Sequence, residues 1–403
     1  MKRRLLAAMV IPAGLAVATF AGAAAASSAN LGWYGCGSGV GSGVPCPPPS
    51  SPPPSPPPSP YLSVPDRLYG VAGTSADDVW AVGLEPSSSL IMHWDGSSWA
   101  TSFTEPVGFF RAVSAVTASD AWAVGGTGWF DESHTLAEHW DGSSWTQAST
   151  PTPGSGVFNG VAATSAEDVW AVGLIGPGPG NSAHSTEPLI EHWNGSAWSE
   201  QTFADPSDGG QFWAAAATSA DDAWAVGWTG DSGEGGGQTT MIYHWNGTSW
   251  TRVSSPDAAG SVNVLYGVTA ISADDAWAVG FTKTADGDEK TLTMHWDGST
   301  WTIVPSPSPG GDAGLQGVSA ASASDIWAVG VANPTSCSHC ETLAMHWDGS
   351  TWTVVPTPNP ASTYLNILLG VAVINGDGSD VWAVGTTDYA STLITHWDGS
   401  SWR

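Results

Sequence analysis

The sequence has 403 residues, of which only 11% are charged, and it contains 50 glycines, 29 prolines and 25 tryptophans. Many turn-forming and aromatic residues with few charged helix formers favour an all-β fold and disfavour helix. Asp and Glu number 37 against 9 Lys and Arg, giving a formal net charge of −28. Such a surface repels phosphate backbones, which argues against a nucleic acid as partner.

The N-terminus predicts an export signal over residues 1–26. A positively charged start at residues 2–4 precedes an apolar stretch, and the small residues 24–26 suit a cleavage site. An uncleaved anchor is the alternative, because this stretch is long enough to span a bilayer. Its Ala/Gly-rich composition, interrupted by Pro12, favours cleavage. The mature chain is expected to be secreted or to lie at the cell surface, without inserting into a membrane.

Two short segments separate the signal from the rest of the chain. Residues 27–44 are Gly/Ser-rich and too few to form a folded module, and residues 45–60 form a Pro/Ser-rich linker. A proline density of this kind predicts extended polyproline II, which acts as a semi-rigid spacer. The globular domain is therefore predicted to occupy residues 61–403.

A two-part motif repeats seven times in residues 61–403, with a period of about 49 residues, as in propeller blades. The first part, Trp-Ala-Val-Gly, begins at Trp80, Trp122, Trp170, Trp224, Trp277, Trp327 and Trp382. The second part, His-Trp-Asp/Asn-Gly, begins at His93, His139, His192, His244, His295, His346 and His396. Seven complete copies predict seven blades.

Each copy contains signals for four antiparallel strands. In the first copy the strands are expected at residues 68–74, 79–82, 90–94 and 99–103. The Asp95-Gly96 pair predicts a type I′ hairpin turn between the third and fourth strands. The sequence thus predicts an all-β fold, a seven-bladed β-propeller of four-stranded antiparallel blades, preceded by a signal peptide and a Pro-rich linker.

The blades are expected to pack through tryptophan, because each copy supplies three of these large side chains. The last copy ends at Arg403, too early to complete its fourth strand. Residues 61–65 resemble the fourth strand of the other copies, and we expect them to complete the last blade and leave the ring without an exposed edge.

The repeats resemble those of secreted bacterial seven-bladed β-propellers of the WD-repeat and kelch-like kind, over residues 61–403. The chain departs from true WD repeats, which carry a Gly-His pair that is absent here. It also departs from sialidase-type Asp boxes, in which one residue separates Asp from Gly, whereas Asp95 and Gly96 are adjacent. The resemblance implies the fold and not a function.

The four cysteines fit an oxidising compartment. Cys36 and Cys46 bracket a Gly-rich stretch, while Cys337 and Cys340 form a Cys-Ser-His-Cys sequence, so we predict two local disulfides. His339 adds a third ligand to the second pair, but structural zinc needs four. No metal site and no cofactor are therefore predicted. Ca²⁺ at some Asp turns stays open as an alternative, although this ion needs six to eight oxygens.

The motif histidines are predicted to be structural, because a residue needed once in every blade for packing occurs once in every blade. The neighbouring carboxylates, such as Asp77 and Asp78, are predicted to cap turns. A catalytic set would break the sevenfold pattern. No residue is therefore assigned a catalytic role.

The loops on one face of the predicted disc vary in length and content, which points to ligand recognition there, with unconstrained drift as the alternative. Each first strand begins with a fixed apolar residue followed by a variable one. The variable residues, expected to ring the mouth of the channel, are Tyr69, Arg111, Asn159, Trp213, Tyr266, Gln316 and Leu369. Their mixture of aromatic, amide and cationic groups suits a polar ligand, and a channel filled only with water is the alternative. Trp129 and Trp228 are expected to be exposed on outer loops of the same face.

These patterns predict an extracellular, non-enzymatic, monomeric binding module that recognises a glycan or a protein through the variable-loop face. One alternative is a polysaccharide hydrolase or lyase with its site at the channel mouth. A glycosidase needs two carboxylates about 5–10 Å apart, and the candidates Asp131, Asp231 and Asp286 lie in separate loops. The other alternative is a purely structural repeat protein of the cell surface.

Overall fold

The computed structural model describes residues 67–403 apart from residues 86–87, 105–107, 129–132, 152–153, 177–185, 205, 207, 231–236, 334–339, 361–364, 375, 377 and 389–390. The predicted signal, the Gly/Ser-rich segment, the linker and the predicted closing strand at 61–65 lie outside the described residues. The unit Pro60–Arg403 is compact and contains all the described strands. No helix among the described residues is long and apolar enough to cross a membrane.

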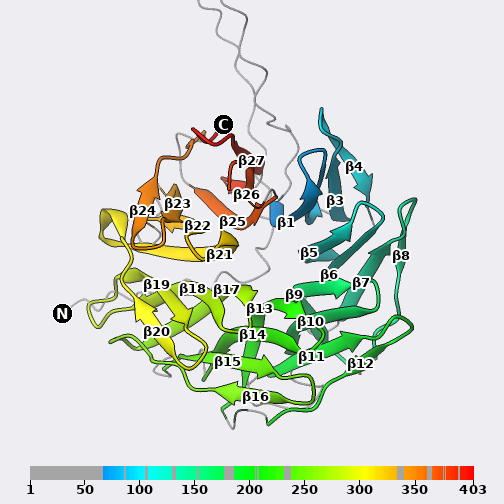
Figure 1. Ribbon diagram of the computed structural model, residues 1–403, viewed down its shortest axis with the longest axis horizontal. Coiled ribbons are helices and arrows are strands. Elements are labelled where there is room, and N and C mark those ends of the chain that lie inside the picture. Colours follow the sequence, from blue (N-terminus) through cyan, green and yellow to red (C-terminus); the bar gives the residue numbers. More distant parts are fainter. Residues whose placement is uncertain are drawn as a thin grey trace, which may run out of the picture. The chain divides into compact units, whose positions relative to one another are not determined.

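Seven antiparallel sheets stand around a central axis, as the sequence predicted (Figure 1). Blade 1 consists of β1 (Arg67–Ser75), β2 (Asp78–Glu85), β3 (Ser88–Trp94) and β4 (Trp99–Phe103). Blade 2 consists of β5 (Phe109–Thr117), β6 (Asp120–Thr127), β7 (His134–Trp140) and β8 (Trp145–Gln147). Blade 3 consists of β9 (Gly156–Ser165), β10 (Asp168–Ile175), β11 (Glu187–Trp193) and β12 (Trp198–Glu200).

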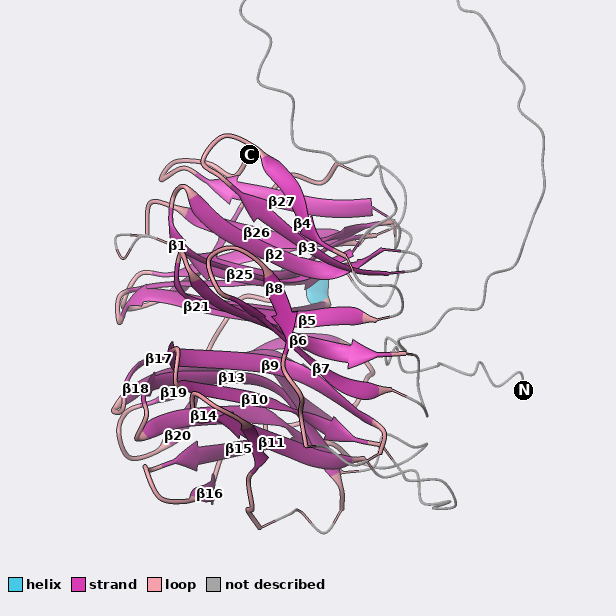
Figure 2. Ribbon diagram, turned by 90° about the vertical axis from the view of Figure 1, so that its right-hand side faces the viewer, coloured by secondary structure: helices cyan, strands magenta, loops and turns pink. Residues whose placement is uncertain are grey.

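The remaining blades repeat this order, and the strands of all blades run between the two faces of the disc (Figure 2). Blade 4 consists of β13 (Gly210–Ser219), β14 (Asp222–Thr229), β15 (Thr239–Trp245) and β16 (Trp250–Val253). Blade 5 consists of β17 (Val262–Ser272), β18 (Asp275–Lys283), β19 (Glu289–Trp296) and β20 (Trp301–Val304). Blade 6 consists of β21 (Ala313–Ser322), β22 (Asp325–Ala332), β23 (Glu341–Trp347) and β24 (Trp352–Val355). Blade 7 shows β25 (Asn366–Val373), β26 (Val381–Thr387) and β27 (Ser391–Trp397).

Tryptophan fills every interface between neighbouring blades, which confirms the predicted packing. The ring centroid of Trp80 on β2 lies 5.1 Å from those of Trp140 and Trp145 in the next blade. The other six interfaces repeat the triplet with Trp122–Trp193–Trp198, Trp170–Trp245–Trp250, Trp224–Trp296–Trp301, Trp277–Trp347–Trp352, Trp327–Trp397–Trp402 and Trp382–Trp94–Trp99. The last triplet joins blade 7 to blade 1, so the same contact closes the ring.

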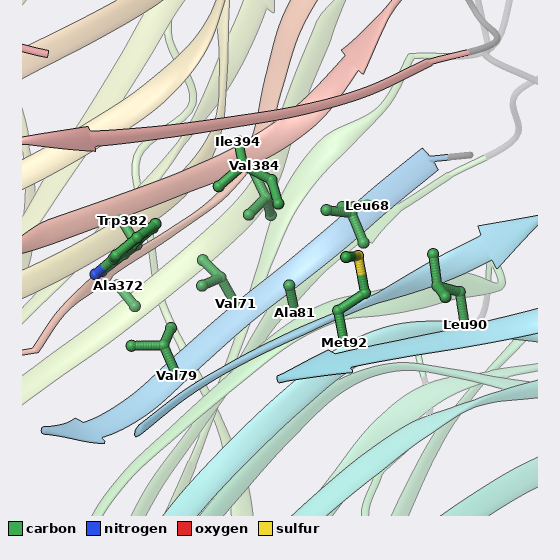
Figure 3. Packing of buried hydrophobic residues seen from close by; sticks show 10 residues of the cluster. All are labelled: Leu68, Val71, Val79, Ala81, Leu90, Met92, Ala372, Trp382, Val384 and Ile394. Carbon is green, nitrogen blue, oxygen red and sulfur yellow. The ribbon is translucent and has the colours of Figure 1, made fainter. Parts of the chain in front are cut away.

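Apolar residues complete each interface. Between blades 7 and 1, Leu68 and Val71 of β1 belong to one buried cluster with Trp382, Val384 and Ile394 of the last blade (Figure 3). Each sheet thus buries both faces against its neighbours, which an isolated four-stranded sheet cannot do.

The motif histidines tie each blade together internally. The Nε2 atom of His93 on β3 lies 2.7 Å from the carboxylate of Asp78, the first residue of β2, and the ring of His93 packs on Trp80 with centroids 4.1 Å apart. The other six blades have the same His–Asp pair at 2.6–2.9 Å. The prediction that Asp78 caps a turn is wrong, because its carboxylate bonds to His93 and accepts from the Thr74 hydroxyl.

The predicted type I′ turn between the third and fourth strands is also wrong. The loop spans four residues, from Asp95 to Ser98, and only Gly96 takes a positive φ, of 85°. The Asp95 carboxylate accepts bonds from the backbone N–H groups of Ser97 and Ser98 and from the Ser97 hydroxyl. The Ser97 hydroxyl bond, followed by the two backbone bonds, lowers the pKa of Asp95 to about 2.

The His–Asp pairs predict that the free energy of unfolding falls in acid. Burial would raise the pKa of Asp168, but hydrogen bonds from His192 and Thr164, together with the charge of His192, outweigh it and hold the pKa below its ordinary value of 3.8. A carboxyl whose pKa is lowered by folding stabilises the native state above its unfolded pKa, and this contribution is lost as the pH falls through the folded pKa. The pair therefore contributes at neutral pH and not in strong acid.

We expect Asp168→Asn to lower the free energy of unfolding at pH 7 by about 1–3 kcal/mol, because it removes the negative charge beside His192 and replaces one of the two acceptor oxygens, which bond to His192 and Thr164, by an NH2 group. In urea titrations at decreasing pH, the difference from the wild type should shrink below about pH 4. Asp286→Asn is the control and should change little, because Asp286 is an exposed aspartate in the turn between β18 and β19. A difference that stays constant down to pH 2 would contradict this account.

Blade 7 shows where the predicted closing strand would add. In blade 1, four β3 residues including Ile91 and Met92 pair with β4. In blade 7, Trp402 bridges to Trp397 and Arg403 bonds to the backbone of His396, while the next two β27 positions have no fourth-strand partner among the described residues.

Deletion of residues 1–66 should therefore lower the melting temperature by roughly 5 °C or more, because it removes the apolar side chains and the strand edge that would complete blade 7. Deletion of residues 1–44 keeps this segment and should leave the melting temperature unchanged. Differential scanning calorimetry of the two truncations tests the prediction, and equal melting temperatures would refute it.

Candidate functional site

The variable residues predicted to ring the channel all lie at one irregularity, a β-bulge in the first strand of each blade. Pairing in β1 passes from Leu68 opposite Gly83 directly to Gly70 opposite Val82, so Tyr69 is the extra residue. The same shift in the other six blades makes extra residues of Arg111, Asn159, Trp213, Tyr266, Gln316 and Leu369.

The bulge explains how the first strand serves both the core and the channel. Residues three apart in a regular strand point to opposite faces, yet Leu68 and Val71 join the same buried cluster. The extra residue resets the alternation and re-aims its own side chain, as bulges do next to functional sites. Tyr69 is thereby released from the interface while its neighbours remain in it.

The glycine of each Trp-Ala-Val-Gly motif makes this geometry accessible. A Cβ atom on Gly83 would lie 1.7 Å from the carbonyl oxygen of Arg67 on the bulged strand. The same contact would be 1.9–2.0 Å at Gly125, Gly173, Gly227, Gly280, Gly330 and Gly385. Only glycine lets the two backbones approach so closely.

Six of the seven extra residues line one central cavity of about 180 Å³. They are Tyr69, Arg111, Asn159, Trp213, Tyr266 and Gln316, and they lie in the first half of their strands, towards the variable-loop face. The seventh, Leu369, packs instead on the buried cluster of Val331, Cys340, Leu365 and Ile367. The blade that carries Leu369 contributes Gly370 and Val371 to the wall.

Arg111 is the cationic group of the cavity. Its guanidinium carbon lies 4.7 Å from the ring centroid of Tyr69, 5.1 Å from that of Phe109 and 5.5 Å from that of Trp213. Its Nε atom is buried and has no hydrogen-bond partner within the described part of the chain. Aromatic rings therefore surround the charge without neutralising it.

One wall of the cavity is aromatic. Trp213 stacks on Trp228 with centroids 5.6 Å apart and an interplanar angle of 18°, and Tyr266 meets Trp213 edge-on at 5.1 Å. Tyr266 in turn stacks on Phe281 at 5.9 Å. The Nε1 atom of Trp213 is buried without a hydrogen-bond partner among the described residues.

The expectation that Trp228 is exposed on an outer loop is wrong. Trp228 belongs to β14 and is only 8% exposed, since it stands behind Trp213 and supports it. The sequence predicted a loop at Trp228 because this residue follows Gly227. The strand β14 instead continues past the glycine to Thr229.

The two amide side chains of the cavity, those of Asn159 and Gln316, differ in burial. Asn159 is 7% exposed, and its Nδ2 group donates to the carbonyl of Phe212 in the next blade at 2.8 Å. The position of its amide is therefore fixed by a neighbouring blade. Gln316 is partly exposed and lines the cavity from the opposite part of the ring.

The pKa values of Tyr266, in the aromatic wall, and of Glu289 are raised above their ordinary values. Burial, and then the charge of Glu289, raises the pKa of Tyr266, so its phenol remains a hydrogen-bond donor at neutral pH. Burial and the charge of Asp312 raise the pKa of Glu289, and Lys283 partly offsets the effect. Asp286 is exposed in the turn between β18 and β19.

Several predicted residues cannot be placed. Trp129, Asp131 and Asp231 lie outside the described residues, as do Cys36, Cys46 and Cys337. Cys340 is described and is buried beside Leu365. No cluster of three or more His, Cys, Asp or Glu placed to hold a metal ion occurs within the described ranges.

The bulges and the aromatic stack behind Trp213 were not predicted from the sequence. A signal for the bulges was present, because Leu68 and Val71 are both apolar and three residues apart, a spacing that uninterrupted alternation does not explain.

No protein-family model and no curated protein matches the chain. Among solved structures, the chain is similar to YCF48 bound to D1 peptide, with 14% identity, a TM-score of 0.52, and coverage of 84% of this chain and 97% of that one. It is similar to an ulvan lyase bound to a GlcA–Rha3S saccharide, with 10% identity, a TM-score of 0.52, and coverage of 85% and 97%. It is also similar to an inactive virginiamycin B lyase from Staphylococcus aureus with quinupristin, with 13% identity, a TM-score of 0.51, and coverage of 83% and 97%. These likenesses show the propeller fold.

Gly227→Ala tests whether the glycine is required for the bulge that carries Trp213. Its Cβ would lie 2.0 Å from the carbonyl oxygen of Gln211, so the strand must shift, and we expect the free energy of unfolding to fall by about 1–3 kcal/mol. Gly176→Ala is the control, because its Cβ would have ordinary contacts of 3.5 Å or more. Equal urea midpoints for the two variants would show that the close approach is not needed.

Proposed function

We propose that the protein is an extracellular, non-enzymatic binding module that recognises a glycan or a protein ligand at the channel mouth on its variable-loop face. The observation that carries this proposal is the ring of bulge residues. A sevenfold-repeated backbone presents a different side chain at nearly every bulge, and six of these side chains share one cavity. Loops and irregularities held by a rigid scaffold are where proteins place recognition residues.

The chemistry of the ring supports binding of a polar ligand. It combines one guanidinium, two amides and three aromatic side chains, which together offer hydrogen bonds and flat apolar surfaces. The described residues that line the cavity include no carboxylate, so the carboxylate pair that a glycosidase needs is absent from this part of the wall. Propellers of similar fold include one bound to a peptide and one bound to a saccharide, which is compatible with either ligand class.

A polysaccharide hydrolase or lyase is the second candidate, and one observation favours it. Tyr266 and Glu289 lie close enough for the Glu289 charge to raise the pKa of Tyr266, and paired groups with shifted pKa values occur at catalytic sites. Structural ion networks shift pKa values as well. Release of reducing or unsaturated sugar ends that Glu289→Gln abolishes would establish the enzyme in place of the binding module.

Three further features belong to the proposal and await their own measurements. We propose that the chain is exported, that it acts as a monomer, and that Cys337 and Cys340 form a disulfide in the exported protein. Mass mapping of the purified exported chain would decide the disulfide, and free thiols or a bound metal there would overturn it.

The combined variant Arg111→Ala, Trp213→Ala and Tyr266→Ala should reduce binding of any ligand identified on glycan and protein arrays by at least about 100-fold, because it removes the cation and two aromatic faces of the cavity. Retention of the fold is checked by circular dichroism. Trp129→Ala changes a residue predicted to lie on an outer loop, and this comparison variant should bind like the wild type. If Trp129→Ala abolishes binding while the combined variant retains it, the site lies on the outer loops.

A further inference from the structure

Arg111 is a cation that has no anionic partner among the described residues. No ion pair or hydrogen bond engages its guanidinium within the described part of the chain, although the protein carries 37 acidic and only 9 basic residues. The described ion pairs join carboxylates to the motif histidines, to Lys290 and to Arg403 instead. In a protein so rich in carboxylates, a guanidinium that pairs with none of the described ones indicates a position available to an anionic ligand.

The surroundings of Arg111 leave its guanidinium with contacts that are weaker than hydrogen bonds to a carboxylate. The rings of Tyr69, Phe109 and Trp213 pack around the guanidinium and its Nε atom is covered, while Arg111 as a whole is half-buried. Cation–π contacts are weaker than the paired hydrogen bonds that a guanidinium makes to a carboxylate. Among the described residues that line the cavity, none supplies an anionic acceptor for Arg111.

The other side chains that line the cavity indicate the kind of ligand to which the anionic group is attached. The aromatic faces of Tyr69, Trp213 and Tyr266 suit the C–H faces of a sugar ring, and the amides of Asn159 and Gln316 suit its hydroxyls. The cavity, of about 180 Å³, offers these groups to one sugar ring at a time.

Resting on the proposed binding function, we propose that the cavity recognises the single carboxylate of a terminal uronic acid on an otherwise neutral glycan, with Arg111 as its anion-binding residue. The net charge of −28 favours a ligand with a single carboxylate over a ligand with many. At physiological ionic strength charges interact over only about 8 Å, so one carboxylate at Arg111 is attracted locally. A polyanion would place further charges against the acidic surface and is repelled.

The test compares methyl β-D-glucuronide with methyl β-D-glucoside by saturation-transfer NMR on the full chain. We expect the glucuronide to bind at least about tenfold more tightly, because a hydrogen-bonded charge pair forms only with the acid. Arg111→Gln should abolish this preference, and Arg111→Lys should retain part of it, since the ammonium keeps the charge without the planar fork. Alginate, a polymer of uronic acids, should compete poorly with the glucuronide.

Arg252→Gln is the matched control, because it makes the same change of charge at an exposed position of the outer strand β16. It should bind like the wild type. Equal binding of the two glycosides, or a preference that survives in Arg111→Gln, would overturn the inference.

Two further outcomes separate the inference from the proposed function. A tripeptide with a free C-terminal carboxylate that binds more tightly than its amide, in the absence of glucuronide binding, would replace the uronic acid by a protein end and overturn the inference. If arrays identify a neutral ligand whose binding requires Trp213, the inference fails and the proposed function stands. If no ligand of any class binds at the cavity, both fail.

Discussion

The close approach of each first strand to a glycine of the second strand is the contact on which the rest of the structure depends. At Gly83 a Cβ atom would lie 1.7 Å from the Arg67 carbonyl, so any other residue would separate the two strands. The approach allows a bulge, and the bulge allows Leu68 and Val71 to enter the same interface. The same residue insertion places a side chain at the channel, so core packing and the candidate site have one structural cause.

This arrangement separates the parts of the repeat that must stay constant from those that can vary. The tryptophan triplets between blades and the His–Asp pairs within them occur in all seven copies, and each fixes the position of a strand. The bulge residue contributes to neither set of contacts in any of the seven blades. It can therefore differ in every blade without loss of packing, which is how a symmetric scaffold can present an asymmetric surface.

The number of blades, the strand order, the tryptophan packing and the ring of variable residues could all be predicted from the sequence, because each follows from a repeat and from alternation. The bulges could not be predicted from alternation alone, since one extra residue reverses every later side chain. Asp78 and Trp228 were misassigned for a related reason. Their partners, His93 and Trp213, lie 15 residues away in the sequence, and pairing across strands depends on a register that the local sequence does not specify.

The central claim is that ligands contact the ring of bulge residues, and the indole N–H signal of Trp213 tests it most directly. The signal can be assigned in ¹⁵N-tryptophan-labelled protein by its absence from Trp213→Phe, and then followed while a ligand identified on the arrays is added. The account predicts that the Trp213 signal shifts, because the residue lines the cavity and a ligand there changes the surroundings of its indole ring. A Trp213 signal that stays unchanged at saturation, while the Trp129 signal shifts, would contradict the account.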